Sequence, residues 1–373
     1  MFLVSRSTIY RRIDEFNLHE FGCYSDISDD DLTEILLNYY HQQSRLVGFP
    51  MAYGYLRSIG LRIQQKRVKE CIRRIDPFFG RLRWATVIHR RSYNVRAPNS
   101  LWHIDGHHSL VKYGFVIHGS IDGFSRLITF LRCSTNNQAV TVLQLFQRAV
   151  EDFGLPSRVR TDHGGENIRV WEMMESRQGA NRGSALRGTS TQNQRIERLW
   201  RDVFRCVSST FYYLFQSMIG NGVLNTECRL HMFVLHYVFQ PRINHSLVLF
   251  SESWNNHPLR TERNKSPSQI WQNGMVDVRN RNLITTQNLL DGNNEIVDDL
   301  EWYGFDPNVT AMQNHDSEEE LGQVIVENII DDYVNLRNYL DNQNIDLLQE
   351  SPSFGLDIYL EILNLCLNLA DEI

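Results

Sequence analysis

The sequence predicts an α/β fold in which a mixed sheet is flanked by helices, preceded by a small all-helical region and followed by an acidic tail. The first support is a run of three apolar or β-branched segments, residues 101–105, 114–122 and 127–132, separated by Gly, Asp and Ser. The second is the order of the following segments, which continues as helix, strand, helix and long helix. The third is charge, because acidic residues dominate only after residue 290.

Residues 1–96 are predicted to form a helical, helix-turn-helix-like DNA-binding region. Its expected helices cover residues 1–18, 28–43, 54–60 and 63–75. Ser28 is the expected N-cap of the second helix, and Gly60 ends the third. A helix, a glycine turn and a basic helix are the layout of a unit that reads a DNA groove.

The basic helix carries the residues that we expect to contact DNA: Lys66, Arg67, Lys69, Arg73 and Arg74. Between residues 57 and 96 there are 12 Lys and Arg against two acidic residues, Glu70 and Asp76, which gives a net charge of +10. Such a local excess suits a polyanionic partner. The alternative is a helical bundle whose basic face is simply solvated.

Residues 97–275 are predicted to form the catalytic core. After the three strands, the expected elements are a helix over 138–153, a strand over 157–161, a brief helix over 168–174, a loop or short strand over 179–191, a long helix over 192–217 and a further helix over 224–239. Val140, Leu143 and Phe146 keep helical spacing in the first of these helices. Sequential strands followed by a helix and another strand favour a sheet with both antiparallel and parallel pairs.

The tail, residues 276–373, is predicted to be partly helical or flexible. Residues 291–373 contain 20 Asp and Glu and a single basic residue, Arg337, which gives a net charge of −19. Because the whole chain has a net charge of −6, residues 1–290 carry +13. One hypothesis is that the tail competes with DNA for the basic region.

Composition excludes several classes of protein. No stretch approaches ~18 consecutive apolar residues, so no membrane partner is expected. The six cysteines form no C-x-x-C pair and are irregularly spaced, which argues against a zinc site or a disulfide framework.

Three acidic residues occupy the places that metal-dependent phosphodiester chemistry requires. Asp105 and Asp162 each end an apolar strand, and Glu197 lies near the start of the long helix. Two divalent ions about 3.5–4 Å apart can activate an attacking oxygen and stabilise a leaving one. Mg²⁺ prefers such hard oxygen ligands. We therefore expect these three carboxylates to converge.

The same residues lie in segments that resemble the retroviral-integrase-like transposase core, the DDE superfamily with an RNase H-like fold. The matching segments are residues 102–105 (WHID), 121–126 (IDGFSR), 161–167 (TDHGGEN), 194–197 (QRIE), 256–260 (NHPLR) and 266–271 (SPSQIW). The resemblance covers roughly residues 100–274. The 34 residues between Asp162 and Glu197 are close to the spacing of that family.

The resemblance implies an RNase H-like mixed five-stranded sheet. It implies Asp105, Asp162 and Glu197 as catalytic residues and as ligands of Mg²⁺ or Mn²⁺, with two ions. The implied reaction is cleavage of double-stranded DNA and strand transfer into a DNA target by a homo-oligomer assembled on DNA. Nuclear localisation follows from that substrate if the host is a eukaryote.

Several neighbours of the three carboxylates have two interpretations. Gln194, Arg201 and Arg205 could contact DNA, or form a solvated helix face. Asp122 is expected to cap its own turn rather than to bind metal.

The other polar residues near the carboxylates have alternative or purely local roles. His163 and Asn167 either line the site or hold a turn. The histidines near the first strand, His103, His107 and His108, are expected to make local polar contacts.

Two other functions remain open. The first is a transposon-derived DNA-binding protein without catalytic activity. The second is an RNase H-like nuclease that cuts RNA–DNA hybrids. The basic helical region and the segment from Gln194 to Glu197 favour integration over the nuclease.

Overall fold

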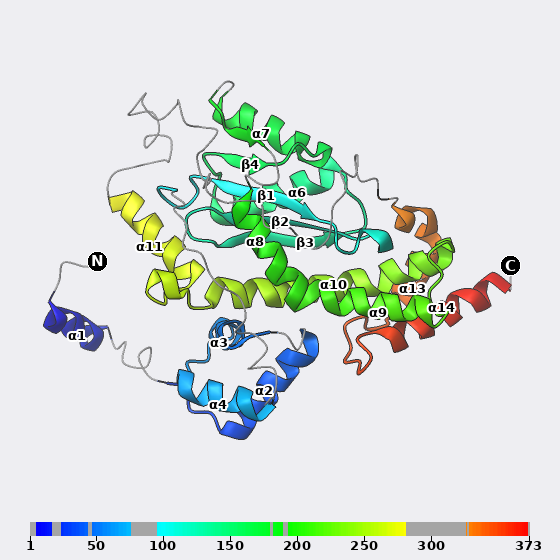
Figure 1. Ribbon diagram of the computed structural model, residues 1–373, viewed down its shortest axis with the longest axis horizontal. Coiled ribbons are helices and arrows are strands. Elements are labelled where there is room, and N and C mark those ends of the chain that lie inside the picture. Colours follow the sequence, from blue (N-terminus) through cyan, green and yellow to red (C-terminus); the bar gives the residue numbers. More distant parts are fainter. Residues whose placement is uncertain are drawn as a thin grey trace.

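The computed structural model describes residues 5–16, 24–43, 47–75, 95–179, 182–188, 193–280, 326 and 328–371. Across these residues a five-stranded sheet lies on one side of a long helix, α10 (Arg229–Asn256), and the N-terminal helices lie on the other (Figure 1). Residues 76–94 and the acidic stretch over 281–325 lie outside the described residues.

The sheet is mixed, with the strand order β3-β2-β1-β4-β5. Its strands are β1 (Trp102–His107), β2 (Val116–Asp122), β3 (Ile128–Ser134), β4 (Val159–Thr161) and β5 (Ala185–Arg187). β1, β2 and β3 pair antiparallel because short connections join them, whereas β4 and β5 run parallel to β1 after helical crossovers. The predicted RNase H-like mixed sheet of five strands is confirmed.

Helices cover both faces of the sheet. One face carries α6 (Ala139–Phe153) and α7 (Ile168–Gln178). A buried cluster there includes Trp102, Ile104 and Phe146. The other face carries α8 (Gln194–Val203), a π-helical turn (Phe204–Ser208), α9 (Ser209–Gly220) and α10. The predicted long helix after residue 192 is therefore present, interrupted by one π turn.

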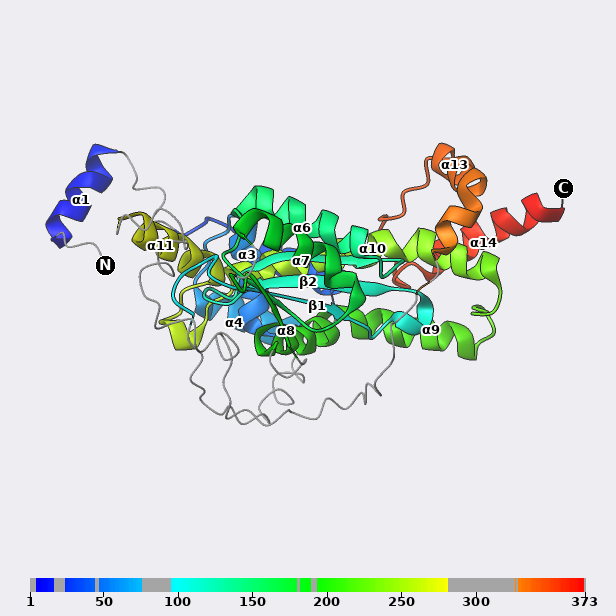
Figure 2. The same cartoon turned by 90° about the horizontal axis from the view of Figure 1, so that it is seen from above.

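The N-terminal region is helical, as expected. Its helices are α1 (Arg6–Glu15), α2 (Asp29–Gln42), α3 (Phe49–Ser58) and α4 (Gln65–Ile75). Ser28 caps α2 as predicted, because its Oγ accepts a 3.1 Å hydrogen bond from the Asp31 N–H. α3 begins earlier than expected, since Pro50 in its first turn suits a helix start. α1 stands apart from the other helices in both views (Figures 1 and 2).

α10 is longer than the sequence predicts. We expected a helix ending near residue 239, before Pro241, but Pro241 lies inside a 28-residue helix. Proline removes one hydrogen bond from a helix interior. Packing on several sides offsets that loss, because α10 contacts β3, α3 and the C-terminal helix.

Two asparagines of α10 bond to the outer edge of β3. The Asn244 amide accepts from the Cys133 N–H at 2.8 Å and donates to the Cys133 carbonyl at 3.0 Å. Asn255 does the same at Ile128, at 2.9 and 3.1 Å. Eleven helical residues and five strand residues both span about 16 Å, so the two bonds fit one straight helix. The edge backbone groups at these positions are thereby satisfied.

The described C-terminal segment folds onto α10. Its helices are α13 (Val334–Asn342) and α14 (Leu356–Asp371). Arg229 pairs with Asp332, Tyr237 donates to Asp341 at 2.9 Å, and Arg242 donates to the Leu347 carbonyl at 2.7 Å.

This placement bears on the predicted units and on the hypothesis about the tail. One buried apolar cluster runs from α2 through α10 to α14, so the three predicted units share a core. Two acidic residues of the tail, Asp332 and Asp341, meet α10 rather than the basic α4, so these contacts give no support to competition with DNA. No helix among the described residues is long and apolar enough to cross a bilayer.

Candidate active site

Asp105 lies in the middle of the sheet, on β1, and is half-buried. Its Oδ1 accepts a 2.9 Å hydrogen bond from the Gly106 N–H. Its Oδ2 accepts a 2.9 Å hydrogen bond from the indole N–H of Trp200 on α8. Each carboxylate oxygen keeps a lone pair for a further ligand.

Asp162 follows β4 directly. β4 pairs with β1 so that Trp102 lies opposite Val159, and three residues further this register brings Asp162 beside Asp105. The Asp162 Oδ1 accepts hydrogen bonds from the Gly164 N–H at 3.1 Å and from the Asn167 amide at 3.0 Å. These two bonds orient the carboxylate toward β1.

Glu197 belongs to α8, which is fastened to β1 at its start. The Asn193 amide donates to the Ile104 carbonyl at 2.9 Å, and its Oδ1 lies 2.7 Å from His103 Nδ1. Asn193, Glu197 and Trp200 are four and three residues apart, so they share one face of the helix. Because Asn193 and Trp200 both bond to β1, Glu197 is held between them on the side of Asp105.

The charges of Glu197 and Asp162 act on Asp105. The pKa of Asp105 is held well above its usual range, first by burial and then by the negative charges of Glu197 and Asp162. The bonds from Trp200 and Gly106 act in the opposite direction because they stabilise the ionised form. Glu197 and Asp162 are thus within electrostatic range of Asp105, and the metal-binding role of the three residues stays a prediction.

The donor set suits a hard divalent cation. Three carboxylates supply oxygen ligands alone, which matches Mg²⁺ or Mn²⁺. A cation among them would replace the repulsion at Asp105 with attraction. As the side chains stand, no group of three His, Cys, Asp or Glu within the described ranges is arranged as around a bound ion.

Asp122 has the turn role that we expected. Its carboxylate is fully buried and accepts hydrogen bonds from the Ser125 N–H at 2.7 Å, the Ser125 hydroxyl at 2.6 Å and the Asn99 N–H at 2.9 Å. Burial raises its pKa to about 6 although these bonds oppose the shift. Asp122 therefore holds the loop before β3 and is not a ligand.

Of the polar residues near Asp162, some lie in the site and one is exposed to solvent. Asn167 is buried and bonds to Asp162, so it belongs to the site, whereas His163 is exposed. Glu166 is half-buried, and its pKa is raised by burial first and also by the charge of Asp162. Glu166 is a further acidic residue that the sequence patterns did not single out, although it lies in the motif that carries Asp162.

The histidines make local contacts, as expected. Burial lowers the pKa of His103 to about 3 and that of His107 to about 3, so both are neutral near pH 7. His103 is tied to Asn193, and the His107 ring stacks on Trp200 with centroids 5.1 Å apart.

The three predicted DNA contacts near Glu197 lie on or beside α8. Gln194 is its first residue and is half-buried, three residues before Glu197. Arg201 is exposed one turn after Glu197. Arg205 is also exposed, lies on the π turn and pairs with Asp202 at 3.3 Å. All three remain predicted DNA contacts.

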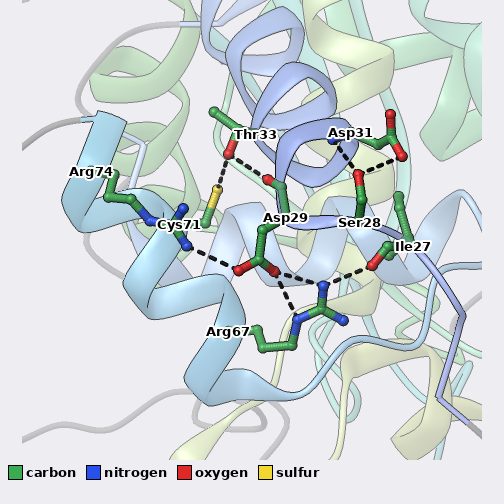
Figure 3. Close-up of polar contacts among 8 residues, drawn as sticks. All are labelled: Ile27, Ser28, Asp29, Asp31, Thr33, Arg67, Cys71 and Arg74. Atoms are coloured by element: carbon green, nitrogen blue, oxygen red, sulfur yellow. Dashed lines mark hydrogen bonds and ion pairs between the residues drawn. The ribbon is translucent and has the colours of Figure 1, made fainter.

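The five basic residues of α4 fall into two groups. Arg67 and Arg74 reach Asp29 of α2 at 2.6 and 3.2 Å, and Arg67 also donates to the Ile27 carbonyl at 2.7 Å (Figure 3). The Arg67 hydrogen bond, followed by that of Arg74, lowers the pKa of Asp29. These two arginines therefore hold α2 to α4.

The other three basic residues of α4, Lys66, Lys69 and Arg73, are exposed. They follow one another by three and four residues, so they form one helical face. The Lys66 Nζ lies 4.0 Å from Glu70, and the Lys69 Nζ lies 4.9 Å from the centre of the Phe49 ring. We call this set the exposed face of α4.

Comparison with known proteins gives one family and several solved structures. A family model described as an integrase core domain matches residues 92–285, just over half of the chain. The HTLV-2 integrase catalytic core domain in complex with magnesium is 18% identical, with a TM-score of 0.30, over 48% of this chain and 99% of that one. No curated protein matches the chain.

Two further solved structures are similarly distant. The simian T-cell lymphotropic virus intasome in complex with a PP2A regulatory subunit is 14% identical, with a TM-score of 0.35, over 58% of this chain and 67% of that one. The BIV integrase catalytic core domain is 13% identical, with a TM-score of 0.32, over 48% and 97%. Likeness at this distance assigns no role to any residue of this chain.

Proposed function

This chain belongs to the integrase core domain family, and from that premise we propose that it is a polynucleotidyl transferase that cuts DNA and transfers the freed strand. The observation that carries the proposal is the Asp105 carboxylate, whose pKa is raised first by burial and then by the neighbouring charges of Glu197 and Asp162. Like charges gathered in this way are the setting in which divalent cations bind.

In the proposed mechanism Asp105, Asp162 and Glu197 hold Mg²⁺ or Mn²⁺, as two ions. The ions would supply an activated attacking oxygen and charge stabilisation at the phosphorus. Asp105 and Asp162 are oriented by their hydrogen bonds, and Glu197 by the anchoring of α8, so the ligands meet the substrate in a fixed geometry.

Two in-line substitutions at phosphorus complete the reaction. Water first attacks a phosphodiester, and the bond to the leaving 3′ oxygen breaks to give a free 3′-hydroxyl. That hydroxyl then attacks a phosphodiester of the target, and a second 3′ oxygen leaves. Neither step needs a protein nucleophile, so the chain contributes positioning and electrostatics.

Double-stranded DNA is the proposed partner. The exposed face of α4, Lys66, Lys69 and Arg73, carries cations that could meet phosphates. Gln194, Arg201 and Arg205 adjoin the carboxylates and are proposed to hold the reacting strand. Because strand transfer joins two ends, we propose a homo-oligomer on DNA, and a nuclear location in a eukaryotic host.

A strand-transfer assay with Asp105→Asn tests this function. We expect the variant to form almost no product, because one anionic ligand is lost while the hydrogen-bonding shape remains. Duplex binding without product from the parent would leave a DNA-binding protein without catalysis, and equal product from both proteins would show that Asp105 does not carry the reaction. Cleavage of an RNA–DNA hybrid, but not of duplex ends, would instead identify a nuclease.

A further inference from the structure

Trp200 connects α8 to the candidate ligand Asp105. Its indole N–H donates to the Asp105 Oδ2 at 2.9 Å, and the side chain is only 5% exposed. A hydrogen bond to an ionised acceptor that is shielded from water is stronger and more directional than one at the surface. A tryptophan that is buried only for core packing does not require a carboxylate as the acceptor of its N–H.

The indole of Trp200 fits at this position because Gly119 has no side chain. Gly119 on β2 lies opposite Asp105 in the antiparallel register. A Cβ at Gly119 would lie 2.6 Å from the Cη2 atom of Trp200, closer than real contacts allow. The indole ring therefore lies against the bare backbone of β2, and this lets its N–H reach the adjacent strand.

His107 packs on a face of the ring. The two ring planes are 13° from parallel, so His107 and Trp200 stack. The missing side chain of Gly119 and the stacked His107 ring together favour the orientation in which the indole N–H reaches the Asp105 Oδ2. The same bond stabilises the ionised carboxylate against its two anionic neighbours.

We propose that Trp200 is a positioning residue that holds the Asp105 carboxylate in the orientation that binds a divalent cation together with Glu197. This inference rests on the proposed function, since it assumes that Asp105 is a metal ligand. Trp200 and Asn193 then fasten α8 on either side of Glu197, so one helix sets the geometry of two ligands.

The test measures Mn²⁺ binding by the full chain without DNA. The electron paramagnetic resonance signal of free Mn²⁺ reports how much of the ion remains unbound. We expect Trp200→Phe to weaken Mn²⁺ binding about 10–100-fold, because partners that orient metal ligands have effects of this size. Trp254→Phe is the matched control, since it also removes a buried indole bond, of 2.8 Å to the Arg126 carbonyl. We expect that control to bind Mn²⁺ as the parent does.

A second variant keeps the test valid if Trp200→Phe does not fold. Gly119→Ala adds a methyl group that displaces the indole ring of Trp200. Trp200 itself is retained, so its N–H group is still present but is moved away from Asp105. We expect Gly119→Ala to weaken Mn²⁺ binding in the same direction. In the strand-transfer assay, excess Mn²⁺ should restore the kcat of Trp200→Phe, since the KM for metal is what rises.

The outcomes separate the inference from the function on which it rests. If Asp105→Asn loses Mn²⁺ binding while Trp200→Phe and Gly119→Ala bind as tightly as the parent, Trp200 is only a core residue and the inference is overturned. If Asp105→Asn binds Mn²⁺ as the parent does, the metal site itself is wrong and both proposals fall.

Discussion

Two charged clusters in this molecule are built in opposite ways. At the centre of the sheet, Asp105 lies near two other carboxylates, and its hydrogen bonds come from Trp200 and Gly106, neither of which is charged. On α4, Arg67 and Arg74 meet the opposite charge of Asp29. Charge that is neutralised inside the chain builds the fold. Charge gathered beside like charge is poised for a ligand.

The largest expected effect is on catalysis. Asp105→Asn should lower the strand-transfer rate on the order of 10³-fold, because it removes an anionic ligand from the repelling cluster. The measurement is product formation under single-turnover conditions in Mg²⁺. Glu172→Gln, an exposed acidic residue of α7, is the control and should keep the parent rate. A parent-like rate for Asp105→Asn would remove the distinction between the two clusters.

The next effect is on DNA affinity, and it divides α4. Replacing Lys66, Lys69 and Arg73 with Ala should weaken duplex binding about 10–100-fold at low salt and reduce the salt slope by about 0.9 for each phosphate that is no longer neutralised. Replacing Arg67 and Arg74 should leave the slope unchanged, because these side chains are committed to Asp29. The measurement is duplex affinity against salt concentration. If the arginine variant changed the salt slope more than the variant of Lys66, Lys69 and Arg73, the ion pairs with Asp29 would have to break when DNA binds.

A smaller effect is on stability without metal. Asp105→Asn should stabilise the metal-free protein on the order of 1 kcal/mol near neutral pH, a few degrees in Tm, because it removes a charge that burial first and the neighbouring carboxylates second disfavour. A raised folded-state pKa means that the parent loses stability as pH rises through that pKa. The gain should therefore shrink at acidic pH. Thermal melts across pH measure it, and a gain that grows on acidification would contradict the predicted repulsion.

The smallest effect concerns the pairing on α4. Asp29→Asn should lower Tm by about a degree or two, because Asp29 is exposed and surface pairs contribute little. Its folded-state pKa is lowered, so this stability is present near neutral pH and is lost as pH falls through the lowered pKa. Melts of both proteins should therefore converge under strongly acidic conditions. Asp30→Asn, one residue away on α2, is the control.

The strands were predictable because local patterns carry them, whereas the roles of Asp105, Asp162 and Glu197 stay predictions. The apolar run before Asp162 marks the end of β4, but β1 continues past Asp105 to His107, so Asp105 lies within its strand. The role of Trp200 was not predictable although it lies three residues after Glu197, because an aromatic residue in an apolar helix is normally assigned to the core. Only the register that places Gly119 opposite Asp105 reveals the contact.

The features that the sequence did not predict depend on distant contacts. Pro241 reads as a helix end, and only packing on β3, α3 and α14 explains a helix that continues through it. The placement of the C-terminal segment is equally nonlocal, because Arg242 and Tyr237 receive it on α10. Nothing in the sequence around Arg242 or Tyr237 indicates which residues these side chains bind.

The asparagines of α10 have a consequence for how copies of this chain could join. A sheet grows when a new strand bonds to a free edge, and Asn244 and Asn255 already occupy the β3 edge at Cys133 and Ile128. Within the described sheet, growth by strand addition is left to β5, whose three residues offer few bonds. Copies of the chain would therefore meet through helices or through DNA rather than by a shared sheet.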